Sequence, residues 1–448
     1  MQFRLVPALF LVTTIGCSID RSGAQTDGAA ASMDATGVMD ARLDRTVDRA
    51  VPDAPADVSR PDRRVDGPGC TFTTRCADPV LETCNAGTVT STICELGCGD
   101  DPTPRCLALQ PSNTSEPFTE IFAMPLRLDG DYDTGSCNGR IGASTGLIDQ
   151  IGGGRACLVR ATSVESVAGD RFTITGPHPL LLLVRDAVEI AGVLDVSARR
   201  DGPGAGGGAP NLSGGGGGEG ANGNRIDNNF GDGGGGGGAL CGDGGDGGGA
   251  TGAGGGAGGA RIATLLRPLI GGNAGGFGTP IDSTGGDGGA GGGALQLTSS
   301  VSIAVSGRIL AGGGGGGPGT VGPITSDNIG AGGGGGSGGG LLLEAPTIRF
   351  LPGAVVRVTG GGGGGSSACS FEGPGQPGGD GADHRRAPGG AEGPICMNGN
   401  DFGEDGGTSG GGSTRDGDHG GTHPARGNGG GGGGGVGCLI LRTFQGVN

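Results

Sequence analysis

Segments in which apolar and polar residues alternate recur through the second half of the chain. In residues 301–309, apolar side chains occupy every second position until Gly307 interrupts the alternation. Residues 188–196 and 348–358 show the same arrangement, each with a glycine at the interruption. A period of two is typical of β-strands with one buried face, and an internal glycine marks a bend. Each segment is therefore predicted to form two short strands that meet at a corner.

The strand segments recur at regular offsets, which predicts a repeat architecture. Leu295 and Leu297 are followed 46 residues later by Leu341 and Leu343, and residues 436–444 form a last partial copy. Short β-repeats bury their apolar faces by stacking on one another. The expected fold class is thus all-β, a parallel β-helix or solenoid with glycine-rich, polyglycine-like insertions. We expect the three alternating segments to meet in one stack and to share backbone ladders.

Blocks of consecutive glycine separate the strand segments. Residues 201–448 contain 96 of the 116 glycines in the 448-residue chain. Unbroken blocks occur, for example, at residues 233–238, 312–317, 332–336, 360–365 and 429–435. Glycine buries no side chain and loses the most backbone entropy on ordering, so these blocks do not form an ordinary core.

Two interpretations of the glycine blocks remain open. In the first, outgoing and returning blocks lie side by side as extended helices with three residues per turn, and their amides pair laterally. In the second, the blocks are flexible linkers. Less regular tips are expected between the blocks, at residues 318–329 and, as the longest, at 366–426. Slow amide exchange over residues 312–336 would distinguish lateral pairing from flexible linkers.

The N-terminal residues are typical of a bacterial export signal. An apolar run at residues 5–12 is followed by a small residue and Cys17, as in a lipoprotein signal. We expect a signal peptide at residues 1–16 and lipidation of Cys17, with ordinary cleavage near Ala24 as the alternative. Residues 17–69 are rich in Asp, Ala and Pro and have no hydrophobic period, so we expect a disordered tether.

The chain has 13 cysteines, and lipidation of Cys17 leaves an even number. In an exported chain this count predicts six disulfides. Residues 70–106 are expected to form a disulfide-rich module whose bridges, of open connectivity, join Cys70, Cys76, Cys84, Cys94, Cys98 and Cys106. Outside the module, the predicted pairs are Cys137–Cys157, Cys369–Cys396 and Cys241–Cys438. Residues 107–200 then hold the first solenoid coils, and 201–448 the glycine-rich coils with long loop excursions.

Charge and composition narrow the possible functions. The net charge is −16, and all 29 basic residues are arginine. The acidic balance argues against nucleic acid and anionic lipid surfaces as partners. The absence of lysine excludes P-loop and kinase lysines. An enzyme is not expected. The alternative is a polysaccharide-binding or polysaccharide-cleaving β-helix protein, in which Arg185-Asp186 or Arg199-Arg200-Asp201 would act on an acidic sugar.

Two motifs are weak candidates for metal binding, and neither predicts a resident cofactor. Carboxylates spaced as in a calcium loop occur at Asp129, Asp131 and Asp133. Thr134 stands where such a loop has glycine, and Arg140 where it has glutamate, which favours a solvated turn. Imidazoles and carboxylates able to bind zinc or copper occur at Asp416, Asp418, His419 and His423. Calcium is the one cofactor left open.

A resemblance to a known family rests on four stretches of the chain, at residues 132–135, 180–198, 265–272 and 291–297. Through them, residues 129–444 resemble the glycine-rich β-solenoid surface proteins common in high-GC Gram-negative bacteria. The resemblance implies a lipoprotein with a small cysteine module near its N-terminus. It implies no activity and no catalytic residues, because none are established for the family.

The expected role is that of a secreted, lipid-anchored protein of the outer membrane or cell surface, structural or adhesive in function. The membrane contact would be the lipid on Cys17. Partners would be extracellular polysaccharide or other surface proteins, reached through the tips, because binding residues concentrate on loops held by a rigid scaffold.

Overall fold

The structure, a computed structural model, describes residues 70–443 apart from residues 71, 78–79, 95–97, 101–102, 107–108, 116–124, 138–143, 201, 211–219, 225–230, 251, 263–264, 280–284, 322–329, 368–372, 395–402, 413 and 423–427. The predicted signal peptide, the lipidated Cys17 and the tether at 17–69 lie outside the described residues, as do Cys369, Cys396 and His423. The described part of the chain is all-β and contains no helix. It divides into two compact units, a small one that ends at Arg105 and a large one that includes Cys106 and everything after it.

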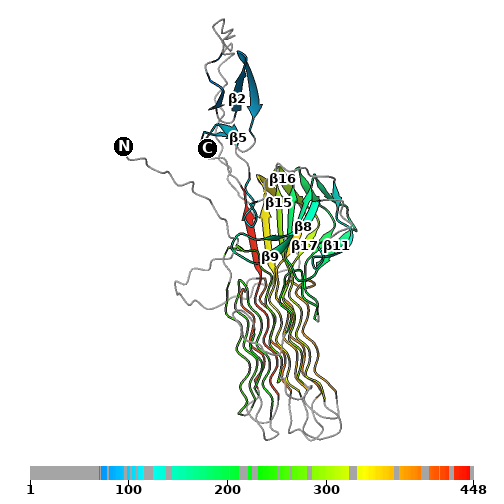
Figure 1. The fold of residues 1–448 in the computed structure, drawn as a ribbon. Helices are drawn as coiled ribbons and strands as arrows, with labels where there is room; N and C mark the ends of the chain where they lie inside the picture. Colours follow the sequence, from blue (N-terminus) through cyan, green and yellow to red (C-terminus); the bar gives the residue numbers. More distant parts are fainter. Residues whose placement is uncertain are drawn as a thin grey trace, which may run out of the picture. The chain divides into compact units, whose positions relative to one another are not determined.

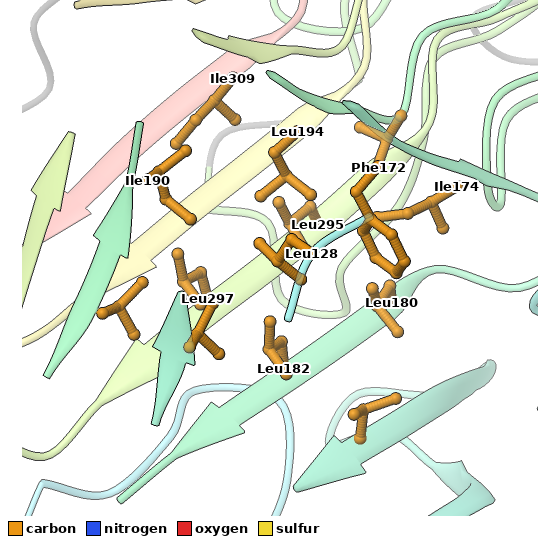
Figure 2. Close-up of a cluster of buried hydrophobic side chains, with 14 of the residues drawn as sticks. Leu128, Phe172, Ile174, Leu180, Leu182, Ile190, Leu194, Leu295, Leu297 and Ile309 are labelled. Carbon is orange, nitrogen blue, oxygen red and sulfur yellow. The ribbon is translucent and has the colours of Figure 1, made fainter. Parts of the chain in front are cut away.

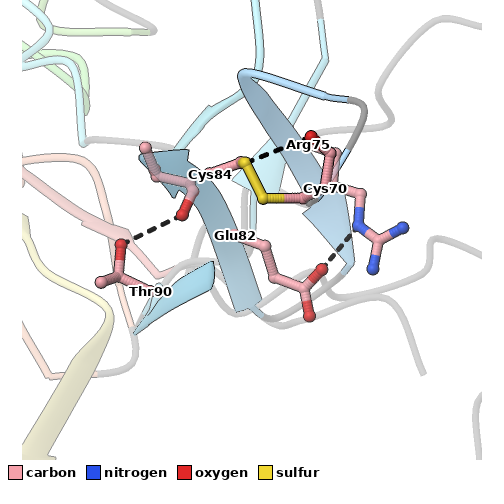
Figure 3. Close-up of a disulfide and its surroundings, with 6 residues drawn as sticks. Cys70, Arg75, Glu82, Cys84 and Thr90 are labelled. Carbon is pink, nitrogen blue, oxygen red and sulfur yellow. Dashed lines mark hydrogen bonds and ion pairs between the residues drawn. A yellow bond between two sulfur atoms is a disulfide. The ribbon is translucent and has the colours of Figure 1, made fainter. Parts of the chain in front are cut away.

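The small unit is built on an antiparallel sheet of three strands, β1 (Thr74–Ala77), β2 (Val80–Asn85) and β3 (Thr88–Ile93). Short strands β4 (Cys98–Gly99) and β5 (Arg105–Cys106) pair with each other. Disulfides join Cys70 to Cys84 and Cys76 to Cys98, and Figure 3 shows the first of them beside the Arg75–Glu82 ion pair. Cys94 of this unit is also disulfide-bonded. So small a sheet has little core, and the bridges supply stability that burial does not.

The strands of the large unit form three sheets, which are drawn in Figure 1. The first sheet contains β6 (Leu126–Arg127), β10 (Val164–Ser166), β13 (Val188–Ile190), β16 (Ser302–Val305) and β19 (Thr347–Phe350). The second contains β7 (Gly130–Asp133), β11 (Arg171–Thr175), β14 (Val193–Asp195), β17 (Arg308–Leu310) and β20 (Val355–Arg357). The third contains β8 (Ser144–Asp149), β9 (Arg155–Ala161), β12 (Leu180–Val184), β15 (Ala294–Ser299), β18 (Gly340–Glu344) and β21 (Cys438–Arg442).

All neighbouring strands in these sheets are parallel except β8 and β9. From β9 onward the chain visits the third, first and second sheets in turn, so every third strand joins the same sheet. The predicted ladders between residues 188–196, 301–309 and 348–358 are present. The 46-residue offset read from the sequence is the register of β15 on β18, which pairs Leu295 with Leu341.

Inward-facing side chains of the three sheets form one continuous core. Ile190 of the first sheet, Leu194 of the second and Leu182 of the third are each at most 1% exposed, and Figure 2 shows them facing one another. Because the register is constant, each inward position repeats along its ladder, as in Leu182, Leu297 and Leu343. Full burial of each such side chain contributes about 1.5–3 kcal/mol.

The third sheet is buried on both faces, unlike a strand with simple alternation. Leu181 and Leu183 of β12 point away from the shared core, yet neither is accessible to solvent. Leu240, Leu266 and Leu269, from segments outside the strands, cover them in a second apolar cluster. This second cover explains why β12 is an uninterrupted apolar run.

The apolar side chains that alternate with polar ones in residues 348–358 are only partly buried. Ile348 packs against the core, but Phe350 is 43% exposed. The reason is that β19 is the terminal strand of the first sheet, so no later strand covers its side chains.

A buried carboxylate ties the N-terminal part of the large unit to its last strands. Glu344 of β18 is inaccessible to solvent. It accepts hydrogen bonds from the Gln296 amide at 2.8 Å and the Thr298 hydroxyl at 2.9 Å, and from the Ser112 hydroxyl at 2.5 Å. The Arg442 guanidinium lies 2.6 Å from it. Four donor groups, one of them charged, therefore depend on this one side chain.

Replacing Glu344 with alanine is expected to lower the free energy of unfolding by about 3–5 kcal/mol, because it leaves the Arg442 charge without its partner. Glu344→Gln keeps an acceptor oxygen and is therefore expected to lower the free energy of unfolding by less than the alanine substitution does. Denaturant unfolding of the two variants and the native chain measures the difference. An alanine variant as stable as the native chain would contradict the role given to this network.

Candidate functional site

The glycine blocks run side by side as extended segments beyond the strands (Figure 1). Their amides donate with a period of three. The amides of Gly234 and Gly237 donate to one neighbouring segment, residues 245–248, and those of Gly235 and Gly238 donate to another, residues 332–335. A repeat of three residues per turn without internal hydrogen bonds is the geometry of a polyproline-II helix. The segments therefore form a bundle of such helices, called here the glycine bundle.

Residues 233–238 lie in the interior of the glycine bundle. All six of their amides and all six of their carbonyls form hydrogen bonds to other segments. The six partner segments are residues 221–224, 245–248, 256–259, 276–279, 332–335 and 432–435. Since every polar backbone group of this block is satisfied laterally, the flexible-linker interpretation is wrong for it and for the similarly paired block 332–336.

Close backbone approach is what requires glycine here. A Cβ atom on Gly334 would lie 1.9 Å from the carbonyl oxygen of Gly236, and one on Gly431 would lie 2.0 Å from that of Gly333. Real Cβ atoms do not approach other atoms so closely. A side chain at these positions would push the segments apart and break the lateral hydrogen bonds.

The longest predicted tip is not a tip in its described part. Residues 373–381, 387–394, 403–411 and 414–422 are further members of the glycine bundle. For example, the amide of Gly363 donates to the carbonyl of Gly407, and that of Gly430 to Gly421. These segments lie at the edge, where one side faces solvent and tolerates side chains. Their sequences therefore have other residues between the glycines and do not resemble those of the interior blocks.

Edge side chains take the place of backbone acceptors. Asp416, His419 and Thr422 are three residues apart, and each accepts a hydrogen bond from an amide of residues 243–249, at 2.9, 3.1 and 3.3 Å. These side chains satisfy amides that have no further segment beside them.

The next segment repeats the arrangement. Asp243 accepts from the amide of Arg261 at 2.6 Å, and Asp246 from that of Gly258 at 2.7 Å. The sequence reasoning did not single out these two aspartates. Their spacing of three within Asp-Gly-Gly triplets is the signal that would have identified them.

Of the residues proposed for zinc or copper, the three that the structure describes are not gathered at one point. Asp416 and His419 face residues 243–249, whereas Asp418 accepts from the Thr408 hydroxyl at 2.6 Å and pairs with Arg386 at 2.6 Å. Within the described ranges, no three His, Cys, Asp or Glu side chains are grouped to hold a metal ion.

The calcium-loop candidates lie along a strand instead of around a loop. Asp131 and Asp133 belong to β7, Asp129 precedes it, and all three are exposed while Tyr132 between them is buried. Asp129 is 3.8 Å from Arg127, and Asp133 accepts from the amide of Gly135 at 2.9 Å. An extended strand places alternate carboxylates in a row on one face, which is not the closed loop of ligands to which their spacing in the sequence corresponds.

Two predicted disulfides are present in the large unit. Cys137 is bonded to Cys157, and Cys241 to Cys438, with Cα–Cα distances of 5.4 Å in both. The second connects a segment of the glycine bundle to β21.

Asp380 lies at the junction of the glycine bundle with the strands. Its carboxylate accepts a hydrogen bond from the amide of Gly315 at 2.8 Å. Burial raises the pKa of Asp380 above its ordinary value of 3.8, and this outweighs the opposing effects of the Gly315 amide and nearby arginines. The folded state therefore holds this proton more tightly than the unfolded state, so ionisation of Asp380 lowers stability as pH rises through the raised pKa.

We expect Asp380→Asn to raise the melting temperature at pH 7, because asparagine keeps an acceptor for Gly315 without the buried charge. Below pH 3.8 the native carboxyl is itself protonated, and the two proteins should melt at similar temperatures. Thermal unfolding between pH 3 and 8 measures this. A difference that stays constant over the range would rule out the electrostatic explanation.

Comparison of the chain with protein-family models, with curated proteins and with solved structures finds no match. Among the described residues there is also no helix with the length and apolar character needed to span a membrane.

Proposed function

We propose that this chain is an exported cell-surface protein, anchored through a lipid on Cys17, with a structural or adhesive role and no catalytic one. In this proposal the three sheets are the walls of a parallel β-solenoid, and the glycine bundle projects from it as a rigid element. The resemblance to glycine-rich surface lipoproteins belongs to the same proposal.

The observation that carries the proposal is the complete lateral pairing of residues 233–238. A bundle held by backbone hydrogen bonds needs no side chains for its cohesion. Its outer rows are then free to vary and to present contact residues, which is the usual division between a rigid scaffold and its binding surface. An enzyme would instead need polar groups that converge in a pocket.

The proposal is tested by producing the full chain and a Cys17→Ser variant in a Gram-negative host. The native chain should incorporate labelled fatty acid, be cleaved by protease added to intact cells, and increase adhesion of the cells to one another or to a polysaccharide-coated surface. The serine variant should lose the label and the adhesion. A native chain that is not lipidated, or whose production leaves adhesion unchanged, would refute the proposal.

A second candidate function, the binding of polysaccharide, is favoured by a specific observation, a cluster of arginines on the second sheet.

A further inference from the structure

Two arginines occupy neighbouring positions on the outer face of the second sheet. Ile309 of β17 and Val356 of β20 pack into the core, so Arg308 and Arg357 beside them point outward. In the ladder Arg308 is paired with Val355, which places Arg357 two residues further along the adjacent strand. Positions so related are about 8 Å apart at Cα, given the spacing of strands and the rise per residue.

A third arginine reaches the same place from the glycine bundle. Arg357 donates to the carbonyl of Ala382 at 3.1 Å, which holds residues 380–386 against the sheet. Arg385 lies in that segment and is exposed. Burial, followed by the nearby positive charge of Arg308, lowers the pKa of Arg357; the charge of Asp383 opposes this, and that of Arg385 adds a smaller lowering effect.

These three arginines lack the ion pairs that their neighbours have. Arg171 and Arg199 both pair with the buried Asp195, and Arg199 is also 3.9 Å from Asp383. Arg308, Arg357 and Arg385 have no carboxylate within ion-pair distance in the part of the chain that the structure describes. In a protein of net charge −16, three adjacent unpaired cations are a local excess of positive charge. Mutual repulsion disfavours such a cluster unless an anion binds to it.

We propose that Arg308, Arg357 and Arg385 form a binding site for the anionic groups of an acidic polysaccharide. Guanidinium groups bind carboxylate and sulfate through paired N–H donors, and they remain charged at all physiological pH values. The outward face of a sheet is open along its length and suits a chain-like ligand better than a small molecule, which needs a concave pocket.

Nucleic acid is the other polyanion to weigh, and the observations disfavour it. Single strands bind by stacking their bases on exposed aromatic rings, but Tyr132 and Phe172, the aromatic residues of the second sheet, are both buried. The strongly acidic net charge opposes long-range attraction of a dense phosphate backbone.

The site is tested with the purified chain and immobilised polymers at low salt. The probes are polygalacturonate, which carries carboxylates, dextran sulfate, which carries sulfates, uncharged dextran, and single-stranded DNA. The native chain should bind at least one acidic polysaccharide, and an Arg308→Gln/Arg357→Gln double variant should bind it at least tenfold more weakly, because it loses two charged hydrogen-bond donors to the ligand. Arg385→Gln should also weaken binding of that polysaccharide.

Arg349→Gln is the matched control. Arg349 is exposed on β19 of the first sheet, and its substitution changes the net charge like each single change at the site. Its affinity should stay within twofold of that of the native chain. Melting curves must show that all variants fold. Any of four results would overturn the inference. Two of them are equal binding by the double variant and the control, and binding of uncharged dextran as tight as that of the acidic polymers. The other two are tighter binding of DNA than of those polymers, and no binding of any probe.

The inference makes the second candidate function specific and rests on it for the ligand class. Its failure would be distinguishable from failure of the surface proposal, because binding is measured on purified protein and does not depend on lipidation, export or adhesion of cells.

Discussion

Replacement of Gly334 by alanine is expected to disrupt the glycine bundle and to lower the stability of the large unit strongly. The added Cβ would lie 1.9 Å from the oxygen and 2.4 Å from the carbon of the Gly236 carbonyl. Both obstructing atoms are backbone, so no side-chain rotation relieves the overlap. Overpacking of a close-packed interior costs about 1–3 kcal/mol when side chains are free to adjust. Here the neighbouring segments are themselves fixed on all sides, and we expect a loss at or above the upper end of that range.

Gly254→Ala is the control for this prediction. Gly254 also lies in the glycine bundle, but a Cβ there would meet only the Asn224 side-chain nitrogen, at 3.6 Å, an ordinary contact. Alanine at such a position is expected to be neutral or to stabilise by about 0.4–1 kcal/mol, because it reduces the entropy of the unfolded chain.

The measurements are thermal unfolding and amide hydrogen exchange over residues 332–336. In the native chain and in Gly254→Ala, these amides should exchange slowly, because each is hydrogen-bonded to a neighbouring segment. In Gly334→Ala they should exchange quickly. If the two alanine variants had the same melting temperature and the same exchange, the close packing of the bundle would be disproved.

The second large effect is expected on removal of the Cys241–Cys438 disulfide by alanine at both positions. The bridge closes a loop with a sequence separation of 197, which includes most of the glycine bundle and two strands of each of the three sheets. Chain-entropy arguments assign about 5 kcal/mol to closure of a loop of this length. The double variant should therefore unfold at much lower denaturant concentration, as followed by equilibrium unfolding of the large unit.

Removal of the Cys70–Cys84 bridge provides the comparison. That bridge lies in the small unit and has a sequence separation of 14. Its loss should leave the unfolding transition of the large unit unchanged. A large unit that is equally stable with and without Cys241–Cys438 would show that lateral pairing alone holds β21 and the bundle together.

The strand architecture was readable from the sequence because its information is local. Apolar residues at every second position define which face of a strand is buried, and Leu295 with Leu341 shows the register directly. Phe350 follows the same pattern and is nevertheless exposed, because the pattern does not tell which strand is last in its sheet.

The candidate sites were less predictable, because they depend on neighbours far away in the chain. Asp416 and His419 look like metal ligands in sequence, but each satisfies an amide of a segment 173 residues earlier. The sequence did not indicate that Arg308, Arg357 and Arg385 lie close together. Their proximity depends on the register of the ladder and on the return of residues 380–386 to the sheet.

By itself, the sequence determined that the chain forms parallel β-ladders in a fixed register and that glycine blocks leave and re-enter them. Only the tertiary structure decided how those blocks pack, which six segments surround residues 233–238, and that much of 366–426 belongs to the bundle. The physical reason is that a run of glycines has no side-chain pattern that could specify which segments it packs against. Its neighbours are selected by backbone hydrogen bonds that any glycine segment could make, and the strands at its two ends set which ones it meets.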